Sequence, residues 1–187
     1  MNTRSNRLPL VMKTITAVTT VMTIILAVLY RIYPRGWLLS TAISLGTTCY
    51  HFSMRLAAGA IVPLFTRNIS YRHGWFQPRK WEPDFYRRLR IKYWKSTLPT
   101  YDPSQFDLKK NTLEQVVRNT CSAEVVHEVI MVCSFVPLLF CIPFGAFPVF
   151  AITSVIAALY DSIFVIAQRY NRPRLVRLLH KKEAQGL

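Results

Sequence analysis

Acidic residues are scarce in this chain, and one long stretch has no charged residue at all. The 187 residues include 9 Asp and Glu against 24 Lys and Arg, and 51% of them are hydrophobic. Between Val129 and Tyr160 there is no Asp, Glu, Lys or Arg. The apolar content excludes a disordered basic tail protein, and a soluble nucleic-acid-binding protein would carry its charge on a globular face. We therefore expect a membrane protein with a basic cytoplasmic side, membrane lipids as partners and no nucleic-acid partner.

The cysteines lack the spacing of a metal site or of a redox pair. No C-x-x-C motif occurs, and all four cysteines lie in or beside apolar segments. They are Cys49, Cys121, Cys133 and Cys141. Such thiols are typically buried and inert, so the sequence predicts neither disulfides nor a metal ion held by cysteine.

Known catalytic signatures are also missing. Ser134 and Ser154 have no G-x-S-x-G context, which excludes the nucleophile of an α/β-hydrolase. Glu124-x-x-His127 matches half of a di-iron carboxylate site. The chain has 4 His in total, however, and the second half of such a site is absent. We therefore expect no bound metal and no resident cofactor.

The apolar segments predict an all-α, polytopic membrane protein with about four transmembrane helices in a single domain, residues 1–187. The long uncharged run exceeds what one helix needs to cross a hydrocarbon core of about 30 Å. Three helix-terminating residues near its centre predict a hairpin. These are Pro143, Gly145 and Pro148. The second span is expected to end at Pro63. The predicted spans are residues 10–30, 37–62, 122–142 and 147–167.

Positively charged residues orient the predicted helices. The segment between the second and third spans, residues 67–120, holds 12 Lys and Arg, and the basic tail, residues 168–187, holds 6. Arg4 and Arg7 also precede the first span. Arg31 and Arg35, in the first loop, argue weakly for the opposite orientation. Because cytoplasmic segments carry the excess of Lys and Arg, we expect both termini to be cytoplasmic.

The segment 67–120 interleaves aromatic residues with basic ones. From Glu82 to Lys95 the spacing predicts one helix with an aromatic face and a basic face. Such a helix lies in the headgroup plane, with its rings toward the acyl chains and its cations toward phosphates. The same composition could bind single-stranded nucleic acid by stacking, but the flanking spans favour an interfacial cytoplasmic segment.

Six ionisable residues lie within predicted spans, where burying charge is costly and functional roles are common. They are His51, Arg55, Glu124, His127, Glu128 and Asp161. Glu124 shares a helix face with His127 and with Glu128. A carboxylate beside an imidazole raises the basicity of the ring, which helps it to deprotonate a hydroxyl acceptor. The alternative is an internal salt-bridge network of Arg55 with Glu124, Glu128 or Asp161 that holds the helices together, with His51 in a structural role.

A polar, arginine-rich seven-mer follows the last predicted span. It reads Gln168-Arg169-Tyr170-Asn171-Arg172-Pro173-Arg174. Because hydrocarbon does not readily hold three arginines, we expect the chain to leave the membrane near Gln168. Three guanidiniums and a side-chain amide would suit an anionic ligand. The alternative is a positively charged anchor that only sets topology.

Together with two upstream motifs, this seven-mer resembles the end of the bacterial glycosyl-diaponeurosporenoate acyltransferases, small membrane proteins of carotenoid-glycoside biosynthesis. The second motif is Thr120-x-x-x-Glu124-x-x-His127, and a weaker third is Trp94-Lys95 with Leu98-Pro99. The resemblance covers roughly residues 75–180. It implies a multi-pass protein of a bacterial plasma membrane.

The resemblance further implies an O-acyltransferase that esterifies a sugar hydroxyl of a glycosylated carotenoid or related glycolipid. The donor co-substrate would be acyl-CoA or a similar thioester, His127 the general base and Glu124 its orienter. The expected substrate-binding residues are Trp94, Lys95, Arg169, Asn171, Arg172 and Arg174. Since no complete catalytic signature is present, the competing hypothesis is a non-enzymatic membrane subunit or lipid-binding protein of a larger complex. The sequence indicates no particular oligomeric state.

Overall fold

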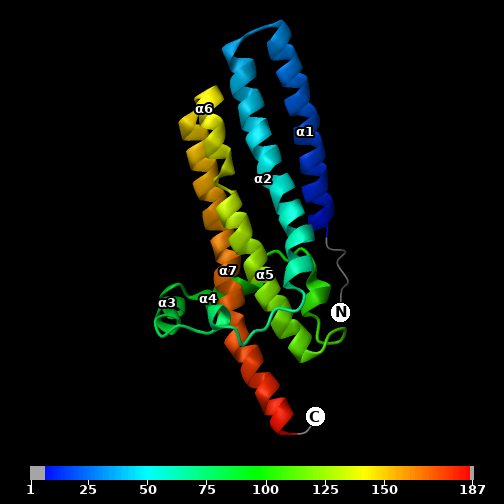
Figure 1. Ribbon diagram of the computed structural model, residues 1–187, viewed down its shortest axis with the longest axis vertical. Coiled ribbons are helices and arrows are strands. Elements are labelled where there is room, and N and C mark those ends of the chain that lie inside the picture. The colour runs from blue at the N-terminus through cyan, green and yellow to red at the C-terminus, as the bar shows by residue number, and fades with distance from the viewer. Residues whose placement is uncertain (1–6, 186–187) are drawn as a thin grey trace. The chain divides into compact units, whose positions relative to one another are not determined.

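The computed structural model describes residues 7–185, and all regular structure within them is helical (Figure 1). The long helices are α1 (Leu8–Ile32), α2 (Gly36–Thr66), α5 (Leu113–Cys133) and α7 (Phe147–Ala184). The short helices are α3 (Glu82–Arg88), α4 (Ile91–Trp94) and α6 (Cys141–Phe144). The 3₁₀ helices are η1 (Gly74–Phe76), η2 (Lys95–Thr97), η3 (Pro103–Phe106) and η4 (Val136–Phe140). The predicted all-α fold is confirmed for these residues; Arg4, used above to orient the first span, lies outside them.

Among residues 7–185, three helical segments are long and apolar enough to cross a membrane. They are Leu8–Ile32, Leu113–Phe144 and Phe147–Ala184, with mean hydropathies of 2.0, 2.3 and 2.1. The 31-residue helix α2 is not among them, since it carries His51, Arg55 and many Ser and Thr side chains. The chain is thus an all-helical membrane protein, and a membrane crossing by α2, the fourth predicted span, stays a prediction.

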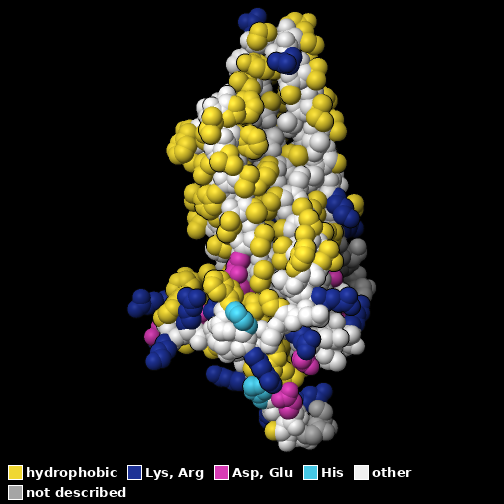
Figure 2. All heavy atoms as spheres, viewed as in Figure 1, with side chains coloured by type: hydrophobic (Ala, Val, Ile, Leu, Met, Phe, Trp, Pro, Cys, Tyr) yellow, Lys and Arg dark blue, Asp and Glu magenta, His cyan; other side chains and the backbone are white. Residues whose placement is uncertain are grey.

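The chain divides into two compact units. The span unit comprises Met1–Ala60 with Val129–Asp161, and the head unit comprises Ile61–Glu128 with Ser162–Leu187. Helices α2, α5 and α7 contribute residues to both units. Apolar side chains cover most of the visible face of the span unit, whereas Lys and Arg are frequent on the visible face of the head unit (Figure 2). This difference is typical of a lipid-facing and a water-facing part.

Helices α1 and α2 pack closely within the span unit. Their shared buried residues are Leu26, Leu38 and Ala42. Farther along the pair, the hydroxyl of Thr20 lies 3.0 Å from the sulfur of Cys49. A Cβ atom added to Gly46 would meet the methyl group of Thr23 at 3.4 Å. Small side chains allow helices to approach closely where no hydrophobic effect drives them together, and Gly46 has this role here.

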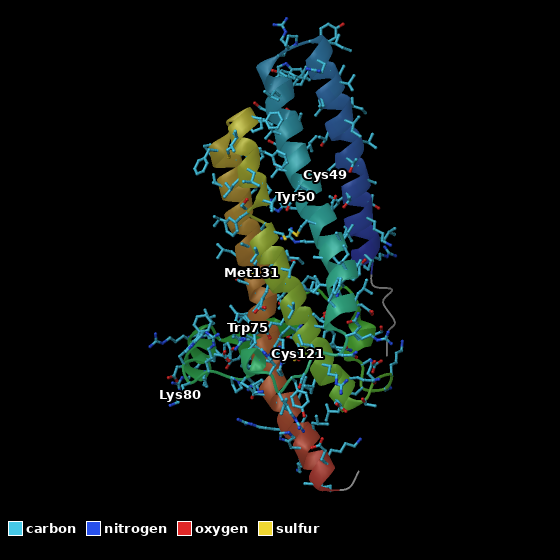
Figure 3. The ribbon with its side chains drawn as sticks, viewed as in Figure 1. Cys49, Tyr50, Trp75, Lys80, Cys121 and Met131 are labelled. Carbon is cyan, nitrogen blue, oxygen red and sulfur yellow. The ribbon has the colours of Figure 1, made fainter. Side chains whose placement is uncertain are left out.

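Several hydroxyl groups in the span unit donate to nearby backbone carbonyls, although the buried hydroxyl of Ser154 has no hydrogen-bond partner among the described residues. The threonines of α1 that donate to carbonyls of the preceding turn are Thr16, Thr19, Thr20 and Thr23. Tyr50 of α2, labelled in Figure 3, donates its hydroxyl to the carbonyl of Cys133 on α5 at 2.8 Å. Since a hydroxyl without a partner is costly in hydrocarbon, these bonds make the threonine content compatible with a membrane span.

The head unit has an apolar core of its own. Its buried members are Tyr71, Phe76, Val117, Cys121 and Leu179. They come from the segment after α2, from α5 and from the C-terminal part of α7. All four cysteines of the chain are free thiols, of which Cys121 is buried and the other three are partly exposed.

The predicted hairpin differs from the structure at its boundaries. Helix α5 begins at Leu113 rather than near residue 122, and it ends at Cys133, before η4 and α6. Prolines occupy these short elements, and their missing N–H groups prevent a continuous α-helix. The chain then turns at Gly145 and Ala146, whose φ angles are 66° and 45°.

Two helices continue beyond their predicted ends. Helix α7 runs past residue 167 to Ala184 with Pro173 inside it, so the seven-mer is helical. Helix α2 continues past Pro63 to Thr66. A proline removes one backbone hydrogen bond and disfavours a helix interior, but side-chain contacts described below hold α7 on both sides of Pro173.

The single helix predicted from Glu82 to Lys95 is wrong. Between α3 and α4, Arg90 adopts a left-handed conformation with φ 51° and ψ 38°. A residue with a β-carbon is unfavourable there, and one such residue interrupts a right-handed helix. Trp81 and Tyr93 are nevertheless exposed, so an aromatic and basic surface persists on two shorter helices.

We expect Gly46→Leu to destabilise the pair of α1 and α2. The larger side chain would clash with Thr23, and overpacking of this kind costs about 1–3 kcal/mol. Thermal unfolding in a neutral detergent would show this as a lower Tm. Gly59→Leu is the matched control on the same helix, because a Cβ at Gly59 meets nothing within 4 Å. Equal losses in both variants would contradict the assigned role of Gly46.

Candidate functional site

Four charged side chains form a buried ion network in the head unit: Glu82, Glu124, Arg169 and Arg172. Arg169 donates to Glu82 from Nη2 at 2.7 Å and from Nε at 3.0 Å, and its Nη1 donates to Glu124 at 2.7 Å. Arg172 donates to the second oxygen of Glu124. Glu124 is 0% exposed, and Glu82 and Arg172 are each 2% exposed.

The ion network also holds the turn η1 and the residue after it. Arg169 donates to the carbonyls of Trp75 at 3.0 Å and of Gln77 at 3.3 Å. Arg172 donates to the carbonyl of Phe76 at 3.2 Å, and its guanidinium lies 4.9 Å from the centroid of that ring. The several donors of each guanidinium therefore fix residues 75–77 against α7.

Helical spacing explains why these partners meet. Thr120 and Glu124 lie one turn apart on α5, and Arg172 donates to the hydroxyl and to the carbonyl of Thr120, both at 3.2 Å. Arg169 and Arg172 lie three residues apart on one face of α7. Thr120 and Glu124 of the motif thus together bind Arg172 of the same chain.

The charges of the ion network balance, with two guanidiniums and two carboxylates. A buried charge costs several kcal/mol unless it is paired and hydrogen-bonded, and every member here has an opposite charge beside it. Arg169 and Arg172 are therefore paired with carboxylates of the chain itself, and their predicted contact with a substrate anion stays a prediction. Sequence reasoning missed Glu82, because it is one of five acidic residues in the segment 67–120 and no local pattern distinguishes it from the others.

Tyr86 connects the ion network to the outer part of the site. Its hydroxyl donates to Glu82 at 2.9 Å, and its ring meets that of Tyr170 edge-on, with 5.6 Å between centroids. Burial raises the pKa of the Tyr86 hydroxyl, and the carboxylate of Glu82 raises it further. Tyr86 therefore stays protonated at neutral pH and remains a donor.

His127 and Glu128 lie on α5 one turn beyond Glu124. The His127 ring is half-buried and stacks on Phe164 of α7, with centroids 4.6 Å apart and planes 10° apart. Both oxygens of Glu128 accept from the indole N–H of Trp75 at 3.1 Å. Since both oxygens of Glu124 accept from arginines, its predicted role in orienting His127 stays a prediction.

A second cluster joins the other predicted binding residues. The ammonium of Lys95 donates to the side-chain oxygen of Asn171 and lies 4.9 Å from the ring centroid of Tyr170. Arg174 donates to the Tyr170 hydroxyl at 2.6 Å, and its guanidinium lies 4.0 Å from the same centroid. Trp94, beside Lys95, donates its indole N–H to the carbonyl of Leu89 at 2.9 Å.

The remaining predicted residues belong to the span unit. Arg55 donates to Asp161 at 2.5 Å and to the carbonyl of His51 at 3.1 Å. His51 is buried, and neither of its ring nitrogens has a hydrogen-bond partner among the described residues. Arg55 and Asp161 thus form the salt bridge that was the alternative to a catalytic role.

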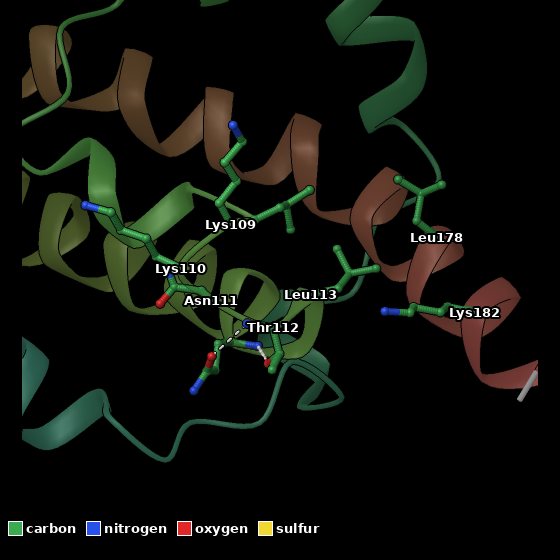
Figure 4. A pocket seen from close by; sticks show the side chains of 9 residues that line it. Lys109, Lys110, Asn111, Thr112, Leu113, Leu178 and Lys182 are labelled. Carbon is green, nitrogen blue, oxygen red and sulfur yellow. Dashed lines mark hydrogen bonds between the residues drawn. The ribbon is translucent and has the colours of Figure 1, made fainter. Parts of the chain in front are cut away.

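One hollow of the head unit is lined by other residues. It encloses about 700 Å³ between the start of α5 and the end of α7 (Figure 4). Its lining includes Lys109, Lys110 and Lys182 but none of the predicted site residues. Within residues 7–185, no group of three or more His, Cys, Asp or Glu side chains is placed to hold a metal ion.

Comparison with known proteins places this site within a family. The family model described as glycosyl-4,4'-diaponeurosporenoate acyltransferase matches residues 72–181. That range contains the ion network, His127, and the cluster of Lys95 and Arg174. Neither the curated proteins nor the solved structures include a match to the chain.

We expect Glu124→Gln to destabilise the protein strongly, because it leaves two arginines beside a neutral amide in a buried site. Breaking a buried ion pair by removing one partner costs about 3–5 kcal/mol. Glu114→Gln is the matched control, since Glu114 of the same helix forms an exposed ion pair with Arg118 at 2.5 Å. Exposed pairs contribute about 0–1 kcal/mol. Thermal unfolding measures both losses, and a Glu124→Gln loss no larger than the control would argue against the ion network as a stabilising element.

Proposed function

This chain belongs to the glycosyl-4,4'-diaponeurosporenoate acyltransferase family, and we propose that it transfers a fatty acyl group to a sugar hydroxyl of a glycosylated carotenoid or related glycolipid. The observation that carries the proposal is the family match over residues 72–181, which includes all the catalytic and substrate-binding residues predicted from the sequence. The donor would be a long-chain acyl thioester such as acyl-CoA.

His127 is the proposed general base. Its imidazole takes the proton of the acceptor hydroxyl while that oxygen attacks the carbonyl carbon of the thioester. The tetrahedral intermediate collapses with cleavage of the C–S bond, and the imidazolium returns its proton to the departing thiolate. The stack on Phe164 supports this role, because it restricts the plane of the imidazole ring.

The ion network has a positioning role in this proposal. It ties α5 to α7 one turn before His127, through the two arginines that share Glu124. General-base catalysis requires the base within hydrogen-bond reach of the acceptor, and small displacements lower the rate steeply. A rigid turn beside His127 therefore contributes to the rate without touching substrate.

The acceptor is proposed to arrive from the bilayer. Exposed aromatic side chains of the head unit support contact with lipid headgroups, where amphipathic rings are enriched. They include Trp75, Trp81 and Tyr93. With the basic residues around them, these rings favour a head unit at the cytoplasmic surface of a bacterial plasma membrane. A glycolipid with its sugar at the headgroup level would then present a hydroxyl to the same layer.

A non-enzymatic role, as a membrane subunit or a lipid-binding protein, is the second candidate. The observation that favours it is the internal pairing of the buried charges, since Glu124 with Arg169 and Arg172 forms a self-contained structural element. In that case loss of the protein would destabilise partner proteins rather than leave an unacylated glycolipid.

We expect purified protein in detergent to form a new acyl ester from long-chain acyl-CoA and a membrane glycolipid extract, as measured by mass spectrometry. His127→Ala should lower the rate by about 10²- to 10⁴-fold, the usual contribution of a general base. His180→Ala is the matched control, because His180 is exposed near the end of α7.

The controls separate the two candidate functions. Wild-type turnover that persists in folded His127→Ala would remove His127 from the mechanism. No ester from folded wild-type protein, with donors and acceptors both varied, would favour the non-enzymatic role.

A further inference from the structure

The basic residues of the head unit fall into two electrostatic classes. Arg169 and Arg172 each contact a buried carboxylate. Lys95 and Arg174 do not: within residues 7–185, their hydrogen-bond and ring partners are Asn171 and Tyr170, which carry no charge. No acidic partner among these residues therefore neutralises the charges of Lys95 and Arg174.

The two unneutralised cations meet on one aromatic ring. The Lys95 ammonium and the Arg174 guanidinium lie 4.9 and 4.0 Å from the ring centroid of Tyr170. Lys95 begins η2 and the other residues come from α7, so the fold joins groups about 80 positions apart in the chain. Such an arrangement is built by tertiary structure, unlike a run of solvated charges along one helix.

Two like charges that contact one ring repel each other, and a bound anion would offset this repulsion. Lys95 is also half-buried. Burial lowers the pKa of the Lys95 ammonium, and the charge of Arg174 lowers it further. The ring of Tyr170 offsets part of this cost, since cations are attracted to aromatic faces. A bound anion would remove the rest.

We propose that Lys95, Asn171 and Arg174 form a subsite for a phosphate group. Lys95 and Arg174 each retain N–H groups beyond the one bonded within the cluster, and the Asn171 amide supplies a further N–H donor. Several donors, two of them charged, and no carboxylate suit a phosphate oxyanion. The phosphate comes either from the thioester donor, which rests on the proposed function, or from the headgroup of a membrane lipid.

Binding to the full-length protein in a neutral detergent tests the subsite without turnover. One arm titrates adenosine 3',5'-bisphosphate, which carries the soluble phosphates of a nucleotide thioester, by calorimetry. The other compares dioctanoyl phosphatidylglycerol with dioctanoyl glycerol, which lacks the phosphate, by native mass spectrometry. The probe that binds identifies the source of the phosphate.

Lys95→Gln and Arg174→Gln should each weaken binding about tenfold or more, as expected for a lost charge-assisted hydrogen bond. The charge-matched controls are Lys92→Gln and Arg177→Gln. Both residues are exposed, and in the sequence they lie close to Lys95 and Arg174 respectively. They should change affinity less than about twofold. An equal loss in the controls would show a general charge effect and overturn the subsite, as would wild-type protein that binds neither probe.

The same measurements separate this inference from the proposed function. Phosphate binding that survives in His127→Ala, with no ester formed even by wild-type protein, would keep the subsite and reject acyl transfer. Normal ester formation with an unchanged donor KM and unchanged binding in Lys95→Gln and Arg174→Gln would reject the subsite and keep acyl transfer.

Discussion

The carboxylate of Glu124, shared between Arg169 and Arg172, is the interaction on which the head unit depends. A fully buried carboxylate is tolerated only with donors on both oxygens, and two guanidiniums supply them. The same guanidiniums donate to Glu82 and to the carbonyls of residues 75–77. The pairing with Glu124 therefore holds α5, α7 and the segment 75–82 together. The register of α7 against α5 follows, because a shift of either helix by one residue would separate the charges.

Helical geometry divides the seven-mer between two tasks. At about 100° per residue, Arg169 and Arg172 lie within about 60° of each other on α7, whereas Arg174 lies about 140° from Arg169. The first two therefore enter the buried network, and Arg174 joins Lys95 on another face. The seven-mer, interpreted from sequence as one anion-binding fork after a membrane exit, could not be divided in this way until α7 was known to continue through Pro173.

Much of the fold could be predicted from the sequence, because the composition of each segment decides whether it can lie in lipid. Uncharged apolar runs predict helices, and the three most apolar ones fulfil the expectation. Glu124 and the seven-mer stood out because charges beside such runs are rare. The partners could not be predicted, since Glu82 meets Arg169 across 87 positions and spacing carries no information over that range. The break at Arg90 escaped the pattern too, because a left-handed residue with a β-carbon depends on tertiary contacts rather than on periodicity.

The buried thiol of Cys121 gives the head unit a natural reporter of its own opening. The side chain is 0% exposed and lies on the helix face next to Thr120 and Glu124, within the apolar core that includes Leu179 from the end of α7. A water-soluble thiol reagent reaches it only when this core opens locally. Its labelling rate would therefore follow the free energy of that opening, as hydrogen exchange does for backbone amides. Lipids, substrates or partners that stabilise the closed head unit would slow the reaction of the thiol reagent with the sulfur of Cys121.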